Sequence, residues 1–416
     1  MKKLLCIALA VILALGAFAG CAAPVAAETT EATDATAAEA TEAPAADTAA
    51  STEPIKVGIL GPHTGDYAVY GLAVKNGAQL YIDQINAAGG INGKQIETIV
   101  YDNKGDSTEA ITAFTRMVDE GITALIGDVL TGNTLAVVGE AYPINMPMIT
   151  ASATAAAVTY DETTGTVYSN VFRTCFIDPF QGEKMAQYAS EKLGAKTAAI
   201  LTQTGNDYAV GLADAFKAKC ADVGITVVAE EGYAKGDVDF KSQLTNILAA
   251  APDVVFCPNY YQDDGMIVTQ AREIGLTSTF LGGDGWAGVS DYASAEDLEG
   301  SYFCSAYAPG STDAVKAFEE AYTTAYGADT LNMFAATAYD AAMVLCAALT
   351  KAEASGAAPA SDEYKQAIID GIKSEGAGVV GITSESGYTF DEYNNPIKSA
   401  VIMTVTGGTE TYKETY

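Results

Sequence analysis

Short apolar runs alternate with amphipathic segments along most of the chain, beginning at Ile55. "IKVGIL" and "QIETIVYD" predict two strands, and residues 71–90 between them carry apolar side chains three and four positions apart, which predicts a helix that ends at Gly89. "STEAITAFTRMVDEG" predicts a second helix with Ser107 as its N-cap, and "ALIG" and "MPMIT" predict further strands around a third helix. This alternation predicts a parallel sheet.

The same alternation restarts after Asp178. Helices separate four further predicted strands, "TAAILTQ", "TVVAEEGY", "DVVFCPNY" and "TFLGGD". Helices then dominate from about residue 312 to 374, and two predicted strands, "GYTF" and "SAVIMTVT", close the chain. We therefore expect an α/β protein with two doubly wound parallel sheets.

The N-terminus has the pattern of a targeting segment. Two lysines precede the apolar run from Leu4 to Phe18, which is short for a membrane-spanning helix. The run ends in "FAGC", which resembles the lipobox of bacterial lipoproteins. The resemblance implies cleavage before Cys21 and a lipid on its sulfur. The alternative is an ordinary signal peptide with a chance cysteine.

The segment after Cys21 differs in composition from the rest of the chain. Residues 22–54 are almost entirely Ala, Thr, Glu, Pro, Asp and Ser, with seven acidic residues and no Lys or Arg. Such a segment buries too little apolar surface to fold, so it predicts a disordered tether. The globular part then begins near Ile55, and its length of about 360 residues suits two domains.

Charge and cysteine content exclude several classes of protein. The chain has 53 acidic residues against 22 Lys and Arg, and no basic stripe, which argues against a nucleic-acid partner. The five cysteines after Cys21 form no CxxC pair, and an odd number does not suit a disulfide framework. We expect most of these to be small buried apolar residues; they are Cys175, Cys220, Cys257, Cys304 and Cys346.

The residues that most enzymes use are scarce. His63 is the only histidine, and the chain has neither an HExxH motif nor a GxSxG elbow. Pairs of acids such as Asp263 and Asp264 fit the first turn of a helix. We therefore expect no catalytic residues, no metal and no cofactor.

Polar loops follow successive predicted strands in both halves. In open α/β sheets, ligands bind beyond the carboxyl ends of the strands. The stretch "PMITASAT", residues 147–154, shows the pattern most clearly, because a buried strand runs directly into small hydroxyl residues. One interpretation is a helix cap. The other is a site where amides and hydroxyls bind a small anion such as a carboxylate.

From Ile55 to about Thr406 the chain resembles the branched-chain amino-acid binding proteins of ABC importers, the leucine/isoleucine/valine-binding type of periplasmic binding protein. The resemblance implies two Rossmann-like lobes joined by three crossover strands, with the ligand between them. It is carried, in chain order, by "GPHTGDYAVYG", "IDQINAAGGINGKQIE", "YDNKGD", "ALIGDVLTGNT", "PMITASAT", "NDYAVG", "PDVVFCPNYYQDDG", "QAREIGL" and "GGDGW".

The resemblance also implies which residues bind the ligand. An amino acid is a zwitterion, so hydroxyl and amide donors suit its carboxylate, an acid suits its ammonium, and aromatic rings bury its side chain. The implied residues are Thr131 and Thr154 (hydroxyls for the carboxylate), Ser152 (a backbone carbonyl for the amine), Asp284 (the acid), Tyr70, Tyr208 and Tyr260 (cleft aromatics) and Phe334 (against the side chain). Tyr208 and Tyr260 could instead be surface or hinge aromatics, and Phe334 a core residue.

The chain departs from the family pattern in three ways. Asp284 is one methylene shorter than the Glu often found there, so the amine must sit deeper or the loop must shift. Thr131 adds a methyl group where Ser is common. Gly105 and Leu130 stand where some relatives form a disulfide in the first lobe.

We therefore expect an extracytoplasmic solute-binding protein, anchored to the membrane by lipid, that captures a branched-chain or other apolar amino acid. It would deliver this ligand, as a monomer, to the membrane subunits of an ABC permease. The alternatives are a ligand-sensing receptor of the same fold for another small polar or amide-like ligand, and an extracellular enzyme. The expected divisions are 1–20 (signal peptide), 21–54 (lipidated Cys21 and tether), 55–173 plus 308–385 (lobe 1) and 174–307 plus 386–416 (lobe 2).

Overall fold

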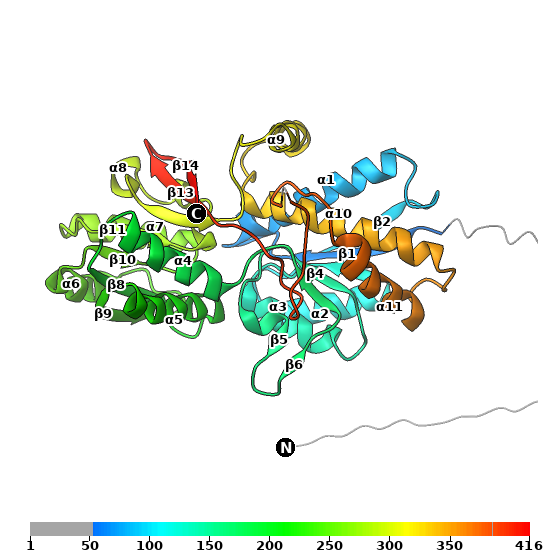
Figure 1. Ribbon diagram of the computed structural model, residues 1–416, viewed down its shortest axis with the longest axis horizontal. Coiled ribbons are helices and arrows are strands. Elements are labelled where there is room, and N and C mark those ends of the chain that lie inside the picture. The colour runs from blue at the N-terminus through cyan, green and yellow to red at the C-terminus, as the bar shows by residue number, and fades with distance from the viewer. Residues whose placement is uncertain (1–52, 385) are drawn as a thin grey trace, which may run out of the picture. The chain divides into compact units, whose positions relative to one another are not determined.

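The computed structural model of the protein describes residues 53–384 and 386–416 (Figure 1). The expectations for the signal peptide, for Cys21 and for nearly all of the tether lie outside the described residues. The described part contains two main sheets, each covered by helices, as the alternating pattern predicts.

The first sheet has five strands in the order β2-β1-β3-β4-β7, and every pair in it is parallel. Its short central strands are completely buried, which suits a parallel sheet with helices on both faces. A small antiparallel hairpin, β5 and β6, lies outside it. The elements of this half are β1 (Ile55–Gly61), α1 (Ala68–Ala87), β2 (Ile96–Asp102), α2 (Ser107–Asp119), β3 (Ala124–Ile126), α3 (Thr131–Ala141), β4 (Met148–Thr150), β5 (Tyr160–Asp161), β6 (Thr166–Val167) and β7 (Val171–Arg173).

The second sheet has seven strands in the order β14-β13-β12-β11-β10-β8-β9. The strands from β8 to β12 are parallel, whereas β13 and β14 add an antiparallel edge. Its elements are α4 (Asp178–Glu191), β8 (Thr197–Gln203), α5 (Asp207–Asp222), β9 (Thr226–Tyr233), α6 (Lys241–Ala250), β10 (Val254–Phe256), α7 (Tyr261–Glu273), β11 (Thr279–Gly282), α8 (Ala295–Leu298), β12 (Tyr302–Ser305), β13 (Val401–Thr406) and β14 (Thr409–Thr415).

Three local predictions were wrong or incomplete. "GYTF" is not a strand: Phe390 makes one isolated bridge with Pro396, and the Tyr388 hydroxyl is held by Asp340 instead. Strands β5, β6, β7, β12 and β14 were not predicted; all of them except β14 have four residues or fewer, too few to show a period. The N-cap of α2 is Asp106 rather than Ser107, since the Asp106 carboxylate accepts hydrogen bonds from the amides of residues 108 and 109.

Three segments connect the two sheets: residues 174–177, 306–312 and 377–400. The third returns to the second sheet only at β13. Before that, the Asn394 amide donates to the carbonyls of Tyr168 and Val171, both at 3.1 Å, in the first half. We therefore propose that the second lobe resumes near residue 400, later than the expected 386.

Helices α9 (Asp313–Tyr326), α10 (Met333–Ala354) and α11 (Asp362–Gly371) lie with the first sheet, although they follow the second in the chain (Figure 1). Among the described residues, α10 is the one helix long and apolar enough to cross a membrane. Most of its apolar stretch is buried inside the fold, where it packs against α1. It is therefore accounted for as a core helix, and it brings Phe334 next to the first sheet.

The five described cysteines are buried, as expected for most of them, and none of the five forms a disulfide. Burial raises the thiol pKa of Cys175, Cys220 and Cys346 to about 12. Gly105 and Leu130, where some relatives have a disulfide, are indeed neighbours, because a Cβ on Gly105 would lie 3.6 Å from a Leu130 methyl carbon.

We expect iodoacetamide at pH 8 to leave all five thiols unmodified in the folded protein, because inaccessible, protonated thiols are poor nucleophiles. Mass spectrometry of intact protein would show this, and all five should react after denaturation. Rapid labelling of any one thiol under native conditions would contradict the burial described here.

Candidate ligand-binding site

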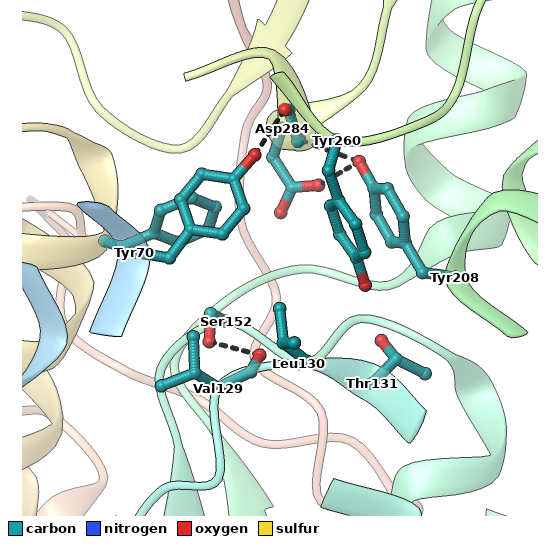
Figure 2. A pocket seen from close by; sticks show the side chains of 10 residues that line it. Tyr70, Val129, Leu130, Thr131, Ser152, Tyr208, Tyr260 and Asp284 are labelled. Atoms are coloured by element: carbon teal, nitrogen blue, oxygen red, sulfur yellow. Dashed lines mark hydrogen bonds between the residues drawn. The ribbon is translucent and has the colours of Figure 1, made fainter. Parts of the chain in front are cut away.

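A small pocket lies where the two halves of the described chain meet (Figure 2). Seven of the eight residues expected from the sequence line it; Thr154 does not. The lining residues are Tyr70, Val129, Leu130, Thr131, Ser152, Tyr208, Tyr260, Asp284, Gly285 and Phe334.

Asp284 forms one side of the cavity, at the carboxyl end of β11. Its side chain is 1% exposed, and burial raises its pKa to about 6, while hydrogen bonds from Tyr208 and Gln181 act to lower it. The oxygen Oδ1 accepts from the Tyr208 hydroxyl at 2.8 Å and from the Gln181 amide at 3.1 Å. Oδ2 has no partner among the described residues. A buried carboxylate oxygen without a donor is costly, so this oxygen is suited to a cationic group in the cavity.

Thr131 and Ser152 lie on the opposite side of the cavity from Asp284 (Figure 2). Thr131 is the first residue of α3, and the N-cap, Leu130, makes no side-chain hydrogen bond to the helix. The positive end of the helix dipole therefore faces the cavity beside a hydroxyl, which suits an anion. The Ser152 hydroxyl donates to the Val129 carbonyl at 2.7 Å, so its proton is already used within the protein.

Thr154 is completely buried, and its hydroxyl has no hydrogen-bond partner among the described residues. Its carbonyl accepts from the amide of Asp178 at 2.9 Å. The Asp178 side chain is 1% exposed, and neither of its oxygens has a partner in the described structure. Burial raises the Asp178 pKa well above its usual range, and the charge of Asp284 raises it further.

Aromatic rings form the remaining walls. Tyr208 and Tyr260 stack with centroids 5.0 Å apart and planes 6° apart, so neither is an isolated surface aromatic. Tyr70 meets Phe334 edge to face at 4.8 Å. Phe334 is at once a core residue and a lining residue, so the two interpretations of it are compatible. Rings in this arrangement bury an apolar group at little entropic cost.

Hydrogen bonds also join the two halves around the cavity. The Tyr70 hydroxyl donates to the Gly285 carbonyl and accepts from the Tyr261 amide at 3.3 Å. The Asp66 backbone carbonyl accepts from the Tyr261 hydroxyl and, at 2.7 Å, from the side-chain amide of Gln262. The structure therefore represents a closed cleft.

Sequence reasoning missed Gln181 and Asp178, which contact or face Asp284 without lining the cavity. Their spacing of three places both on one face of α4, which is a signal that could have been followed. It also missed the contributions of Val129, Leu130 and Gly285, for which the sequence carries no distinctive chemistry.

Comparisons with known proteins agree with this fold. Residues 54–409 match the family described as periplasmic binding protein. The chain is 33% identical over 320 residues to the Leu/Ile/Val-binding protein BraC3 of Rhizobium johnstonii, covering 76% of this chain and 84% of that protein. It is 32% identical over 308 residues to the leucine-, isoleucine-, valine-, threonine- and alanine-binding protein of Pseudomonas aeruginosa, which covers 74% of this chain and 81% of that protein.

Two solved structures are similar over most of the chain. The branched-chain amino acid transporter substrate-binding protein LivJ of Streptococcus pneumoniae, in complex with isoleucine, gives a TM-score of 0.78 at 34% identity, covering 87% of this chain and 99% of that one. The leucine-binding protein LivK of Thermotoga maritima gives 0.77 at 30% identity, covering 87% and 98%. The expected fold class and resemblance are thus confirmed. The chain belongs to the periplasmic binding protein family.

Proposed function

We propose that this protein captures an amino acid with an apolar side chain in the closed cleft and delivers it to an ABC importer. The observation that carries the proposal is the unpartnered Oδ2 of Asp284, buried in a cavity whose opposite side is the N-terminus of α3. A zwitterion satisfies both sides at once, and the aromatic walls suit its side chain. The relatives named above bind leucine, isoleucine and valine, which supports the same ligand class here.

A thermal-shift screen of the purified protein against all amino acids tests this proposal. An amino acid at 100 times its dissociation constant stabilises the protein by about 2.7 kcal/mol, so a true ligand raises the melting temperature clearly. Leucine, isoleucine and valine are the expected hits. No shift with any amino acid, in a protein that unfolds cooperatively, would sink the proposal.

The affinity should depend on pH through Asp284. Its pKa is raised to about 6, and the ammonium of the ligand pairs only with the ionised carboxylate. The dissociation constant should therefore stay flat above pH 7 and rise about tenfold by pH 5, where most Asp284 side chains are protonated. Calorimetry between pH 5 and pH 8 measures this. A constant affinity down to pH 5, with the protein still folded, would assign the amine to another group.

We also propose that the mature protein is a monomer held at the extracytoplasmic face of the membrane by a lipid on Cys21. "FAGC" after a short apolar run supports the lipid anchor. Replacing Cys21 by Ala should abolish the attached lipid, which mass spectrometry of the purified protein detects. Membrane-bound Cys21→Ala protein that still carries lipid would contradict the anchor.

Two other functions remain as alternatives. A sensory receptor of the same fold would bind a ligand but need no permease. Uptake of the ligand by cells that lack the protein distinguishes the receptor from the transport protein, because only loss of the transport protein should abolish uptake. The family is a solute-binding one, and we propose that the protein has no catalytic activity. His63, the one histidine of the sequence, does not line the cavity.

A further inference from the structure

Gln181, on α4, holds Asp284 at two points. Its oxygen Oε1 accepts from the backbone amide of Asp284 at 2.9 Å, and its Nε2 donates to Oδ1 of the same residue at 3.1 Å. Gln181 is completely buried and does not line the cavity. Any effect it has on the ligand must therefore pass through Asp284.

We propose that Gln181 is a positioning residue that turns the Asp284 carboxylate so that Oδ2 alone faces the ligand's ammonium. This rests on the proposed function, because it assigns the amine to Asp284. Oδ1 receives two donors, from Gln181 and Tyr208, whereas Oδ2 receives none from the described residues. The protein thus satisfies one oxygen and reserves the other, which fixes both the site of the ammonium and its direction of approach.

The orientation of the Gln181 amide follows from its partners. A backbone N–H can only donate, so the Gln181 oxygen must face Asp284 N and its amino group must face Oδ1. Glutamate at position 181 can keep the first bond, but it needs a proton to make the second. A leucine side chain at position 181 can make neither bond, and it is similar in size to glutamine.

The two donors to Oδ1 are carried by a closely packed helix pair. Helix α4 carries Gln181, and α5 carries Tyr208. The helices approach closely at Gly182, where an added Cβ would lie 2.7 Å from the carbonyl oxygen of Leu212. Both donors therefore move with the second lobe as one unit, whereas Thr131 and Ser152 come from the first. Gln181 is thus in a position to affect amine recognition without altering the carboxylate side.

The experiment compares L-leucine with 4-methylpentanoate, which is leucine without its amine, by calorimetry on the purified protein. Gln181→Leu should weaken leucine binding about 10- to 100-fold, because a hydrogen bond to a charged group is lost. Binding of 4-methylpentanoate, which has no ammonium to place, should change less than about threefold.

Gln181→Glu adds a readout that a purely structural role would not move. With one proton shared between positions 181 and 284, the variant can reproduce both bonds, so leucine affinity at pH 6 should stay within about threefold of wild type. It should fall at pH 8 as that proton is lost. The titratable groups whose charges interact with that of Asp284 are Asp178 on α4, Tyr208 on α5, Tyr260 before α7, Cys175 in the first connecting segment and Cys304 on β12. Burial raises the pKa of each of these tyrosines and cysteines, so they stay neutral between pH 6 and pH 8.

Gln270→Leu is the matched control. Gln270 also makes two hydrogen bonds, here both to backbone: it accepts from Phe240 N at 2.8 Å and donates to Val238 O at 2.9 Å, and it does not line the cavity. Its loss should leave the leucine to 4-methylpentanoate preference unchanged.

Equal losses for both ligands in Gln181→Leu would overturn the proposal and leave Gln181 a structural residue. The proposal would also be overturned if the leucine affinity of Gln181→Glu had the same pH dependence as that of the wild type. If the wild-type protein binds no amino acid, the proposed function is wrong, and this result is obtained before any variant is compared.

Discussion

Asp284→Asn is expected to weaken amino-acid binding by about 2 to 5 kcal/mol, because the ligand's ammonium is then buried without its counter-charge. Asparagine keeps an oxygen for Tyr208 and Gln181, so the loop should keep its shape. Binding of the matching des-amino acid should change far less. Calorimetry on both ligands with both proteins decides this, and equal losses would mean that Asp284 serves the loop rather than the amine.

The same substitution should affect the free protein in the opposite direction. The folded pKa of Asp284, about 6, lies above its value in an unfolded chain, so the folded state favours the protonated form. The wild type therefore loses stability as pH rises from about 4 to 6, and the loss persists above pH 6. Asp284→Asn has no such charge, and without ligand it should be more stable than the wild type at pH 8 by about 1 to 3 kcal/mol. The difference should shrink towards pH 4, and denaturant unfolding at both pH values measures it.

Gly77→Ala is expected to destabilise the protein by about 3 kcal/mol, at the upper end for an overpacked core. An added Cβ on Gly77 in α1 would lie 2.1 Å from the carbonyl oxygen of Ala335 in α10. Because the obstruction is backbone, no side-chain rotation relieves it, and the two helices must move apart. These helices carry Tyr70 and Phe334, whose rings meet at 4.8 Å, so the aromatic wall should loosen as well.

Gly139→Ala is the control for this prediction. Gly139 lies in α3 with nothing within 4 Å of an added Cβ, so the change should stabilise the helix by up to about 1 kcal/mol. Denaturant unfolding without ligand compares the two variants. A Gly77→Ala protein as stable as the wild type would show that the α1–α10 contact relaxes freely.

Several features were decided by the sequence itself, because they depend on local chemistry. Period and turn residues predicted the helices up to α7 and the strands up to β11 except β5, β6 and β7, and strand β8 was predicted to the residue. The position of Asp284 directly after a buried strand placed it at the ligand-binding edge, as the topology of open α/β sheets requires. "GYTF" and β12 were misjudged because four residues do not distinguish a strand from an extended connection.

The tertiary structure alone decided which polar groups face each other. Asp284 and Gln181 are 103 positions apart, and no pattern along the chain shows that one holds the other. The same holds for Tyr70 and Gly285, which join across the cavity, and for Thr154, which is buried beside Asp178 instead of lining the wall. Local sequence specifies whether a residue lies on a strand end or a helix face. The packing of distant helices and loops decides which oxygen of a buried carboxylate is left without a donor. That oxygen, in turn, determines where a charged ligand binds.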